Sequence, residues 1–138
     1  MRYLLLTISL IPGFALGADS ILPGLYETTI STRMKMGDME MPSRSSAEKN
    51  CITAEDVANG PPLPEPDEAD CEIIKYEFGG GELDMEMVCQ IQGGEGRMVG
   101  TGSYTDDTYE MNNQFKMKAQ GMQMEMNSVA TGRRIGDC

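Results

Sequence analysis

The chain has 138 residues, of which 22 are acidic, 11 are basic and none is histidine, and its formal net charge is −11. A chain this acidic lacks the basic face that phosphate groups require, so we expect no binding to nucleic acid or to anionic lipid surfaces. Without histidine the usual catalytic triads and dyads are absent, so we expect no enzymatic activity and no catalytic residue.

The N-terminus predicts an export signal. One positive charge at Arg2 precedes an apolar run over residues 4–16 that ends in small residues. This pattern is typical of a signal peptide formed by the first 17 residues, with cleavage after Gly17 or, alternatively, after Ala18. The run is too short for a permanent membrane-spanning helix, and no later run is long enough. We therefore expect an exported, soluble protein whose residues 18–138 form one domain.

Alternating side chains predict the first strand over residues 25–36, with one face for the core. The turn signal Gly37-Asp38 is followed by a shorter strand over residues 39–48, interrupted by a proline. Residues 53–59 begin with an N-capping threonine and precede a glycine, which predicts a helix of barely two turns. Residues 59–70, with four prolines in six positions, predict an acidic surface loop rather than a domain boundary.

The stretch from Cys71 to Cys89 predicts a hairpin, because both cysteines lie equally far from Gly80 in a run of three glycines. Folding at the glycines brings Cys71 opposite Cys89, where a cross-strand disulfide fits. The apolar faces of the two strands match only after a one-residue shift, which predicts a bulge near the glycines or near Cys71. The pairs expected after that shift are Ile74 with Met87, Tyr76 with Met85 and Phe78 with Leu83.

Three further strands complete the predicted fold. Turn signals separate strands over residues 97–104 and 109–117 from each other and from a last strand that starts at Met122. Strands joined in sequence order by short turns form antiparallel meanders, and long twisted meanders curl. The sequence therefore predicts an all-β, antiparallel meander curled into a barrel or half-barrel, with one short helix near residues 53–59 and two disulfides.

The cysteines predict those two disulfides, because four cysteines in an exported chain show no metal-ligand spacing. Four cysteines permit three pairings. The hairpin geometry selects Cys71 with Cys89, which leaves Cys51 to pair with Cys138 at the C-terminus. The second bond closes the longer loop and holds the C-terminal tail in place.

Methionine is the main apolar residue after the signal peptide, and it recurs in the pattern Met-x-Met. On a strand this spacing places both thioethers on one face. Four interpretations stay open: packing inside the curved sheet, a soft-metal site for Cu(I), an adaptable pocket for an apolar ligand, and scavenging of oxidants. The methionines expected to line a ligand or metal site are Met34, Met36, Met85, Met87, Met122, Met124 and Met126.

Several segments stand out together: Leu22-Pro23-Gly24-Leu25-Tyr26-Glu27, the Met-rich residues 34–42, Cys51-Ile-Thr-Ala-Glu-Asp56, the spacing of Cys71 and Cys89, and Gly132-Arg-Arg-Ile-Gly-Asp-Cys138. They resemble an exported bacterial family, the domain of unknown function 3617. The resemblance covers essentially the whole mature chain, and the ending is its most specific part. It implies a Gram-negative periplasmic location and brings no established activity, ligand or catalytic residue.

Two functions are consistent with these patterns. The favoured one is a periplasmic, non-enzymatic binding or carrier module whose methionine-lined interior takes a small apolar ligand or a soft metal such as Cu(I). The alternative is a structural or protein-interaction protein of the cell envelope whose methionines only pack the core. No cofactor other than Cu(I) is expected.

Overall fold

The computed structural model describes residues 20–60, 70–91 and 93–138. The predicted signal peptide with its cleavage site, and most of the proline-rich loop expected at residues 59–70, lie outside the described residues. The elements are β1 (Gly24–Met36), β2 (Met39–Glu40), β3 (Arg44–Ile52), α1 (Ala54–Asn59), β4 (Asp70–Gly79), β5 (Glu82–Ile91), β6 (Gly94–Tyr104), β7 (Thr108–Ala119) and β8 (Met122–Gly136).

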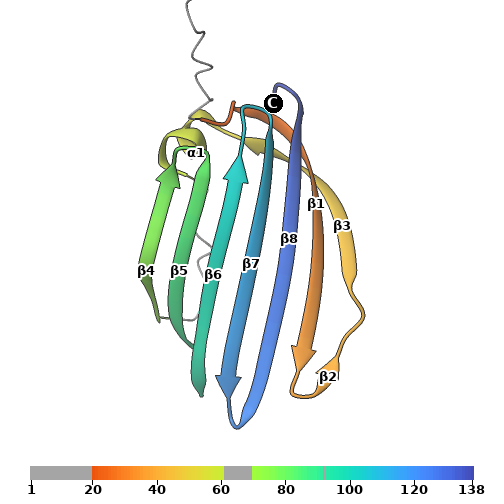
Figure 1. Ribbon diagram of the computed structural model, residues 1–138, viewed down its shortest axis with the longest axis vertical. Coiled ribbons are helices and arrows are strands. Elements are labelled where there is room, and N and C mark those ends of the chain that lie inside the picture. Colours follow the sequence, from red (N-terminus) through yellow and green to blue (C-terminus); the bar gives the residue numbers. More distant parts are fainter. Residues whose placement is uncertain (1–19, 61–69, 92) are drawn as a thin grey trace, which may run out of the picture.

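One curved antiparallel sheet of eight strands makes up most of the molecule (Figure 1). Strands β4 to β8 follow one another as a meander, so the all-β class and the antiparallel pairing are confirmed. β1 pairs with β8 along almost its whole length, and β2 and β3 pair with the other side of β1. The sheet thus runs from β3 at one edge, through β1 and β8, to β4 at the other edge.

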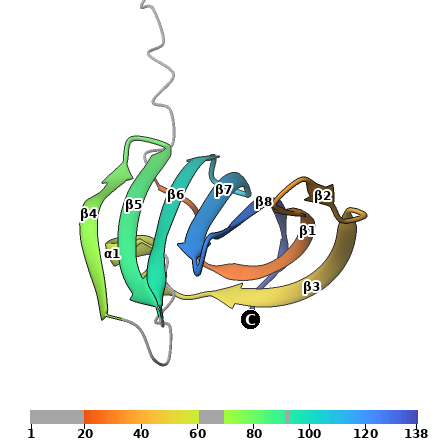
Figure 2. The ribbon, with the colours of Figure 1, turned by 90° about the horizontal axis from the view of Figure 1, so that it is seen from below.

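The sheet does not close into a barrel, so the barrel form of the prediction is wrong. Closure requires the edge strands β3 and β4 to pair, and no such pairing exists in the part of the chain that the structure describes. Residues 44–51 of β3 are exposed on both faces, so this edge has no apolar face to bury against β4. The sheet instead forms an open, curved wall, and α1 lies on its concave side (Figure 2).

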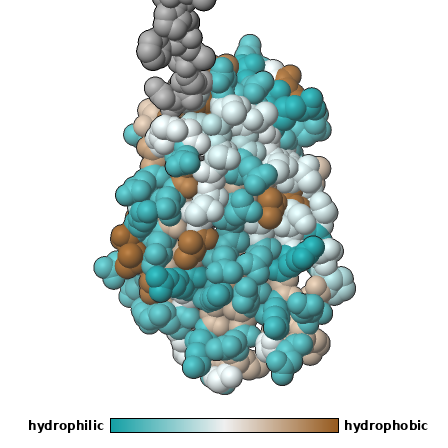
Figure 3. Space-filling view, in the orientation of Figure 1, coloured by the Kyte–Doolittle hydropathy of each residue, from teal (hydrophilic) through white to brown (hydrophobic). Residues whose placement is uncertain are grey.

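Strand alternation separates an apolar concave face from a charged convex face. The convex face, which is the one seen in Figure 3, is mostly hydrophilic. By strand alternation it carries charged side chains such as Glu86, Arg97 and Lys116. The core therefore lies on the concave side, under α1 and the inward-facing side chains. Its most deeply buried residues are Ile21, Tyr26, Thr28, Leu83, Met85, Met87 and Cys89.

β4 and β5 form the predicted hairpin, and the predicted register shift is confirmed. The shift lies next to Ile74, on the side of Cys71 rather than at the glycines, and it leaves Ile73 instead of Ile74 opposite Met87. The turn is Gly80-Gly81, with φ of 62° and 84°, values that glycine adopts without steric strain. The pairs along the hairpin are Cys71 with Cys89, Ile73 with Met87, Tyr76 with Met85 and Phe78 with Leu83.

Both predicted disulfides are confirmed. Cys71 and Cys89 face each other across the hairpin, with Cα atoms 4.0 Å apart. Cys51 and Cys138, with Cα atoms 5.7 Å apart, join the end of β3 to the C-terminus just beyond β8. In the sheet β1 lies between β3 and β8. This second disulfide therefore links the chain segments on either side of β1.

The short helix is confirmed at its predicted place. Thr53 caps it: Thr53 Oγ1 accepts a hydrogen bond from the amide of Asp56 at 3.2 Å, and the Thr53 amide donates to Asp56 Oδ2 at 2.8 Å.

We call the end of the concave face beside α1 the α1 end, and it contains Tyr26 and Tyr109. The opposite end, at the β7–β8 turn, is the methionine end, which contains Met36 and Met124.

Candidate binding site on the concave face

Cross-strand pairing arranges the concave face in rows that cross β1, β8, β7, β6, β5 and β4. Directly opposite side chains on neighbouring strands have Cβ atoms about 4.5–5.5 Å apart, so each row is a continuous band. In the strand order β1, β8, β7, β6, β5, β4, the row nearest the α1 end is Ile30, Ala130, Met111, Gly102, Leu83 and Phe78. The second row is Thr32, Ser128, Asn113, Gly100, Met85 and Tyr76, and the third is Met34, Met126, Phe115, Met98, Met87 and Ile73. The fourth row, at the methionine end, is Met36, Met124, Met117, Gly96, Cys89 and Cys71.

Glycines on β6 give the larger neighbours room on the concave face. A Cβ atom on Gly100 would lie 2.7 Å from Asn113 Oδ1 and 2.9 Å from Met85 Cγ. A Cβ atom on Gly96 would lie 2.9 Å from Phe115 Cζ. Side chains from β5 and β7 therefore lean over β6, which a side chain at these positions would prevent.

A pocket of about 270 Å³ lies at the α1 end, between α1, the end of β3 and the meander. Its lining is mainly apolar and, among the described residues, includes no lysine or arginine. Its volume is just below the roughly 300–1,000 Å³ of typical small-molecule sites, so it suits a small ligand or one end of a longer one. The lining residues are Ile21, Asn50, Cys51, Ile52, Asp56, Phe78, Leu83, Gly102, Ser103, Tyr104, Tyr109 and Met111.

Hydrogen bonds fix one wall of this pocket. Thr28, buried on β1, donates through Oγ1 to Asn50 Oδ1 of β3 at 2.7 Å. The same Thr28 oxygen lies 2.6 Å from Tyr109 Oη of β7. Because a threonine hydroxyl carries one hydrogen, Tyr109 donates this second bond. The pocket wall is therefore held by groups from three strands whose polar atoms are satisfied.

Tyr26 fixes the N-terminal approach to the sheet. Its side chain is fully buried, and its Oη donates to the carbonyl of Leu22 at 2.7 Å and lies 3.3 Å from that of Asp106. Burial raises the pKa of this phenol, and the positive charge of Arg134 opposes the rise. Arg134 Nε in turn donates to the carbonyl of Pro23 at 3.0 Å. The segment before β1 is thus tied to the β6–β7 turn and to the end of β8.

Two segments that carry the family resemblance meet at the α1 end, because the start of β1 pairs with the end of β8. A Cβ atom on Gly24 would lie 2.5 Å from Arg134 Nε. A Cβ atom on Gly132 would lie 2.1 Å from Cε1 of Tyr109. Both positions therefore require glycine, since any larger residue would displace the arginine or the tyrosine ring.

Two polar atoms on the concave face are buried without a hydrogen-bond partner among the described residues: Tyr104 Oη and Asn113 Oδ1. Tyr104 lines the pocket and stacks on Phe78, with ring centroids 5.1 Å apart. Asn113 lies two rows further towards the methionine end, above Gly100. An unpaired buried polar group costs about 1–3 kcal/mol, so each atom is a point where a ligand's polar group or a bound water gains a favourable contact.

The seven methionines predicted to line a site all occupy concave-face positions, but they fall into separate groups. Met85 and Met87 of β5 are buried, with 6% and 4% of their surface exposed. Met122 is 65% exposed and lies beyond the last full row. The remaining four, Met34, Met36, Met124 and Met126, lie together at the methionine end as two directly paired positions of β1 and β8.

Sequence reasoning missed several residues of the concave face. Met98, Met111 and Met117 belong to the rows but lie outside the Met-x-Met pattern, although alternation along residues 109–117 already placed two of them on one face. Tyr104 and Asn113 carried no signal, because an unpaired polar atom follows from packing rather than from residue type.

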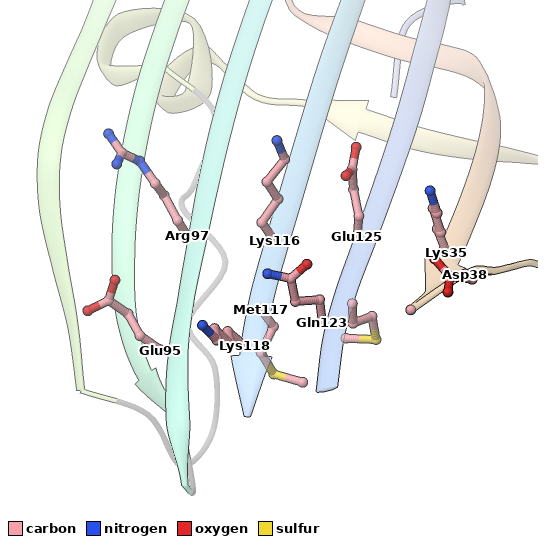
Figure 4. A pocket seen from close by; sticks show the side chains of 11 residues that line it. Lys35, Asp38, Glu95, Arg97, Lys116, Met117, Lys118, Gln123 and Glu125 are labelled. Carbon is pink, nitrogen blue, oxygen red and sulfur yellow. The ribbon is translucent and has the colours of Figure 1, made fainter. Parts of the chain in front are cut away.

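A larger depression of about 530 Å³ lies at the methionine end of the sheet and is lined mainly by side chains of the convex face (Figure 4). Its charges are mixed: Lys35 is paired in register with Glu125 and Glu125 with Lys116, whereas Lys116 is paired with Arg97, which has the same charge. Arg97 forms an ion pair with Glu86. Because the lining mixes basic and acidic side chains on an exposed surface, where single ion pairs contribute little, we place no ion site in this depression.

The described residues contain no group of three or more His, Cys, Asp or Glu side chains placed to hold a metal ion. None of the helices in the described ranges is long and apolar enough to cross a membrane. Both cysteine pairs are oxidised, so the described part of the chain has no free thiol.

A family model described as protein of unknown function (DUF3617) matches residues 21–138. No curated protein and no solved structure matches the chain. The chain belongs to this family.

Proposed function

We propose that this family member is an exported, non-enzymatic binding protein of the Gram-negative periplasm that holds a small, neutral, mainly apolar ligand at the α1 end of its concave face. The observation that carries the proposal is the pocket beneath α1, whose mainly apolar lining includes the buried hydroxyl of Tyr104, for which the described part of the chain supplies no hydrogen-bond partner. An apolar cleft with a few fixed polar groups is the usual form of a small-molecule site.

The lining favours a neutral ligand. Asp56 is the charged residue of the pocket wall, and no described lysine or arginine faces it. A carboxylate or phosphate brought into this pocket would lose its hydration without gaining a cationic partner. The preferred ligand therefore has an apolar body and an uncharged group that hydrogen-bonds to Tyr104 Oη.

The concave face between the pocket and the methionine end extends the proposed site. Beyond Met111, which lines the pocket, the concave face carries Asn113 in the next row and Phe115 beside Met98 in the row after it. Among the described residues no opposite wall of strands covers these rows, because β3 and β4 do not pair. Methionine side chains adapt to ligands of different shape. A ligand longer than the pocket would extend over these rows, past Asn113 Oδ1.

Native mass spectrometry tests this function directly. Protein purified from its own compartment is expected to carry a small neutral molecule, and the disulfide-intact protein is expected to bind the neutral fluorescent probe N-phenylnaphthylamine. Met111→Trp fills the pocket and is expected to abolish probe binding. The matched control is Asn112→Trp, since Asn112 is exposed on the convex face and its replacement leaves the pocket open.

Bare protein that also ignores the probe would contradict the proposal, as would equal binding by the two variants. Thermal unfolding of both variants separates loss of the pocket from loss of the fold. Tyr104→Phe is expected to keep the fold and to weaken a ligand that hydrogen-bonds to the hydroxyl by about tenfold, which corresponds to one hydrogen bond of roughly 1.4 kcal/mol.

A second function is supported by a different observation. β3 is exposed on both faces over residues 44–51, and its outer edge has no neighbouring strand among the described residues. Such an edge accepts an extended segment of another protein. A protein partner of the cell envelope, and not a small molecule, in the native mass spectrum would support this structural or interaction role.

A further inference from the structure

The methionine end brings four thioethers together. Met34 lies opposite Met126, and Met36 lies opposite Met124, on the neighbouring strands β1 and β8. Across the strands their Cβ atoms are about 4.5–5.5 Å apart. Along each strand one residue lies between the two methionines, so their backbone positions are about 6.5–7 Å apart. The four side chains therefore mark the corners of a small rectangle on one face.

The curvature of the sheet brings these side chains closer together. All four occupy concave-face positions of the curved sheet, whose curvature is visible in Figure 2. On the concave side of a curved sheet, side chains from neighbouring strands converge. A methionine side chain has three rotatable bonds, so its sulfur reaches the middle of such a rectangle without movement of the backbone. Met117, which pairs with Met124 on the next strand, places a fifth thioether beside them.

The cluster is accessible to an ion. Met36 is 44% exposed, and Met34, Met124 and Met126 are half-buried, in contrast to the buried Met85 and Met87. The net charge of −11 attracts cations to the protein as a whole. Only a cation that prefers sulfur would stay, because no carboxylate or imidazole group of metal-site geometry exists among the described residues.

We propose that Met34, Met36, Met124 and Met126 form a binding site for Cu(I). Thioethers are neutral, soft ligands that favour Cu(I) over Zn(II), Mg(II) or Ca(II). The bound ion keeps its single positive charge. This site is separate from the pocket under α1 and does not depend on it, so the failure of one proposal leaves the other standing.

The test uses the whole mature protein with its disulfides intact. Its affinity for Cu(I) is measured under anaerobic conditions by competition with a colorimetric Cu(I) chelator, and Ag(I), which has the same ligand preference and needs no reductant, is titrated in parallel. The variant carries Met34→Leu, Met36→Leu, Met124→Leu and Met126→Leu, which conserve side-chain volume. The matched control carries Met85→Leu and Met87→Leu, which remove two thioethers from the buried part of the same face.

We expect the natural sequence and the control to bind one Cu(I), and the four-leucine variant to bind at least roughly 100-fold more weakly, since even outer-sphere changes at metal sites cost about 10- to 100-fold. X-ray absorption should show only sulfur neighbours. Circular dichroism and thermal unfolding verify that the variant is folded. If the natural sequence takes no Cu(I) from the chelator, or the variant and the control lose affinity equally, the proposal is wrong. Zn(II) is expected not to bind, and tight Zn(II) binding would also contradict a thioether site.

Discussion

The two ends of the concave face are built in different ways. At the α1 end, hydrogen bonds hold Tyr26, Thr28 and Tyr109 in fixed positions, and glycines allow contacts that no other residue fits. At the methionine end, flexible thioethers lie in an exposed or half-buried layer, with Met36 44% and Met122 65% exposed. One end is specified by directional bonds and close packing, and the other by unbranched side chains that tolerate rearrangement.

This difference predicts different responses to substitution at the two ends. Hydrogen bonds from Tyr26, Thr28 and Tyr109 and the Cys51–Cys138 disulfide hold the wall of the α1 end, where Tyr104 Oη is buried without a partner among the described residues. At the methionine end, where Met36 and Met122 are exposed, we expect the replacement of any single side chain to cost little stability. Substitutions at corresponding positions of the two ends should thus differ in their effects.

The largest difference is expected from the disulfides. Removing Cys51–Cys138, which spans 87 residues, should lower the free energy of unfolding by about 4–5 kcal/mol, and removing Cys71–Cys89, which spans 18, by about 3 kcal/mol. The reason is the larger loop entropy released in the unfolded chain. Urea unfolding of the two paired Cys→Ala variants measures this. A larger loss for the hairpin disulfide would show that the edge strand β4, and not the α1 end, limits stability.

A methyl group added at a glycine should lower the free energy of unfolding more at the α1 end than at the methionine end. Gly132→Ala places Cβ 2.1 Å from the ring of Tyr109, which its hydrogen bond to Thr28 holds in place, so we expect a loss of about 3 kcal/mol. Gly96→Ala meets only the far ends of the Phe115 and Ile91 side chains, at 2.9 and 3.0 Å, and side-chain ends move at lower cost than a ring held by a hydrogen bond, so we expect a loss of about 1 kcal/mol. Denaturant unfolding measures both losses, from the shift of the midpoint when the slope with denaturant concentration is unchanged. Equal losses for the two variants would contradict the expected difference between the ends.

Loss of the hydroxyl group should change the stability of the protein in opposite directions at Tyr26 and at Tyr104. Tyr26→Phe removes a donor to two backbone carbonyls and should destabilise the protein by about 1–2 kcal/mol. Tyr104→Phe removes a buried hydroxyl without a described partner and should leave stability unchanged or raise it by about 1 kcal/mol. Differential scanning calorimetry of the ligand-free proteins compares them. Destabilisation by Tyr104→Phe would reveal a partner for this hydroxyl in the free protein.

The smallest effect is a pH dependence at the alkaline limit. Burial raises the pKa of Tyr26 and of Tyr76 above 10.0, so the folded state keeps these phenolic protons longer than the unfolded state does. Their contribution to stability is complete below pH 10 and is lost as the pH rises through the folded-state pKa. The pKa of Lys75, raised by its hydrogen bond to Asp84, acts in the same direction. Tyr26→Phe should flatten the decline of unfolding free energy above pH 10, and an unchanged decline would show that Tyr26 does not contribute to it.

Much of the fold followed from local patterns. Alternation predicted β1, the capping threonine predicted α1, and the spacing of Cys71 and Cys89 about the glycines predicted the hairpin with its bulge. These features depend on neighbouring residues in the chain, where side-chain period and turn chemistry act directly. The disulfides followed because the pairing of two cysteines in a hairpin leaves one choice for the others.

The open edge and the polar anchors did not follow from the sequence. Whether a curled sheet closes depends on the pairing of its two edge strands, and 17 residues, 53–69, separate β3 from β4 in the chain. Pairing of β1 with β8 likewise joins segments about 100 residues apart, for which alternation carries no information. Tyr104 and Asn113 became candidates only from the packing, in which their buried polar atoms have no partner within the described ranges.

The most direct test of ligand binding at the α1 end uses the twelve methionines that follow Met1 as reporters. Protein labelled with carbon-13 in the methionine methyl groups is titrated with N-phenylnaphthylamine and followed by NMR spectroscopy. We expect the methyl signal of Met111, which lines the pocket, to shift first and most, while Met36 and Met124 at the methionine end stay nearly unchanged. A spectrum in which no methyl signal moves, or in which Met36 and Met124 move and Met111 does not, would contradict a ligand site beneath α1.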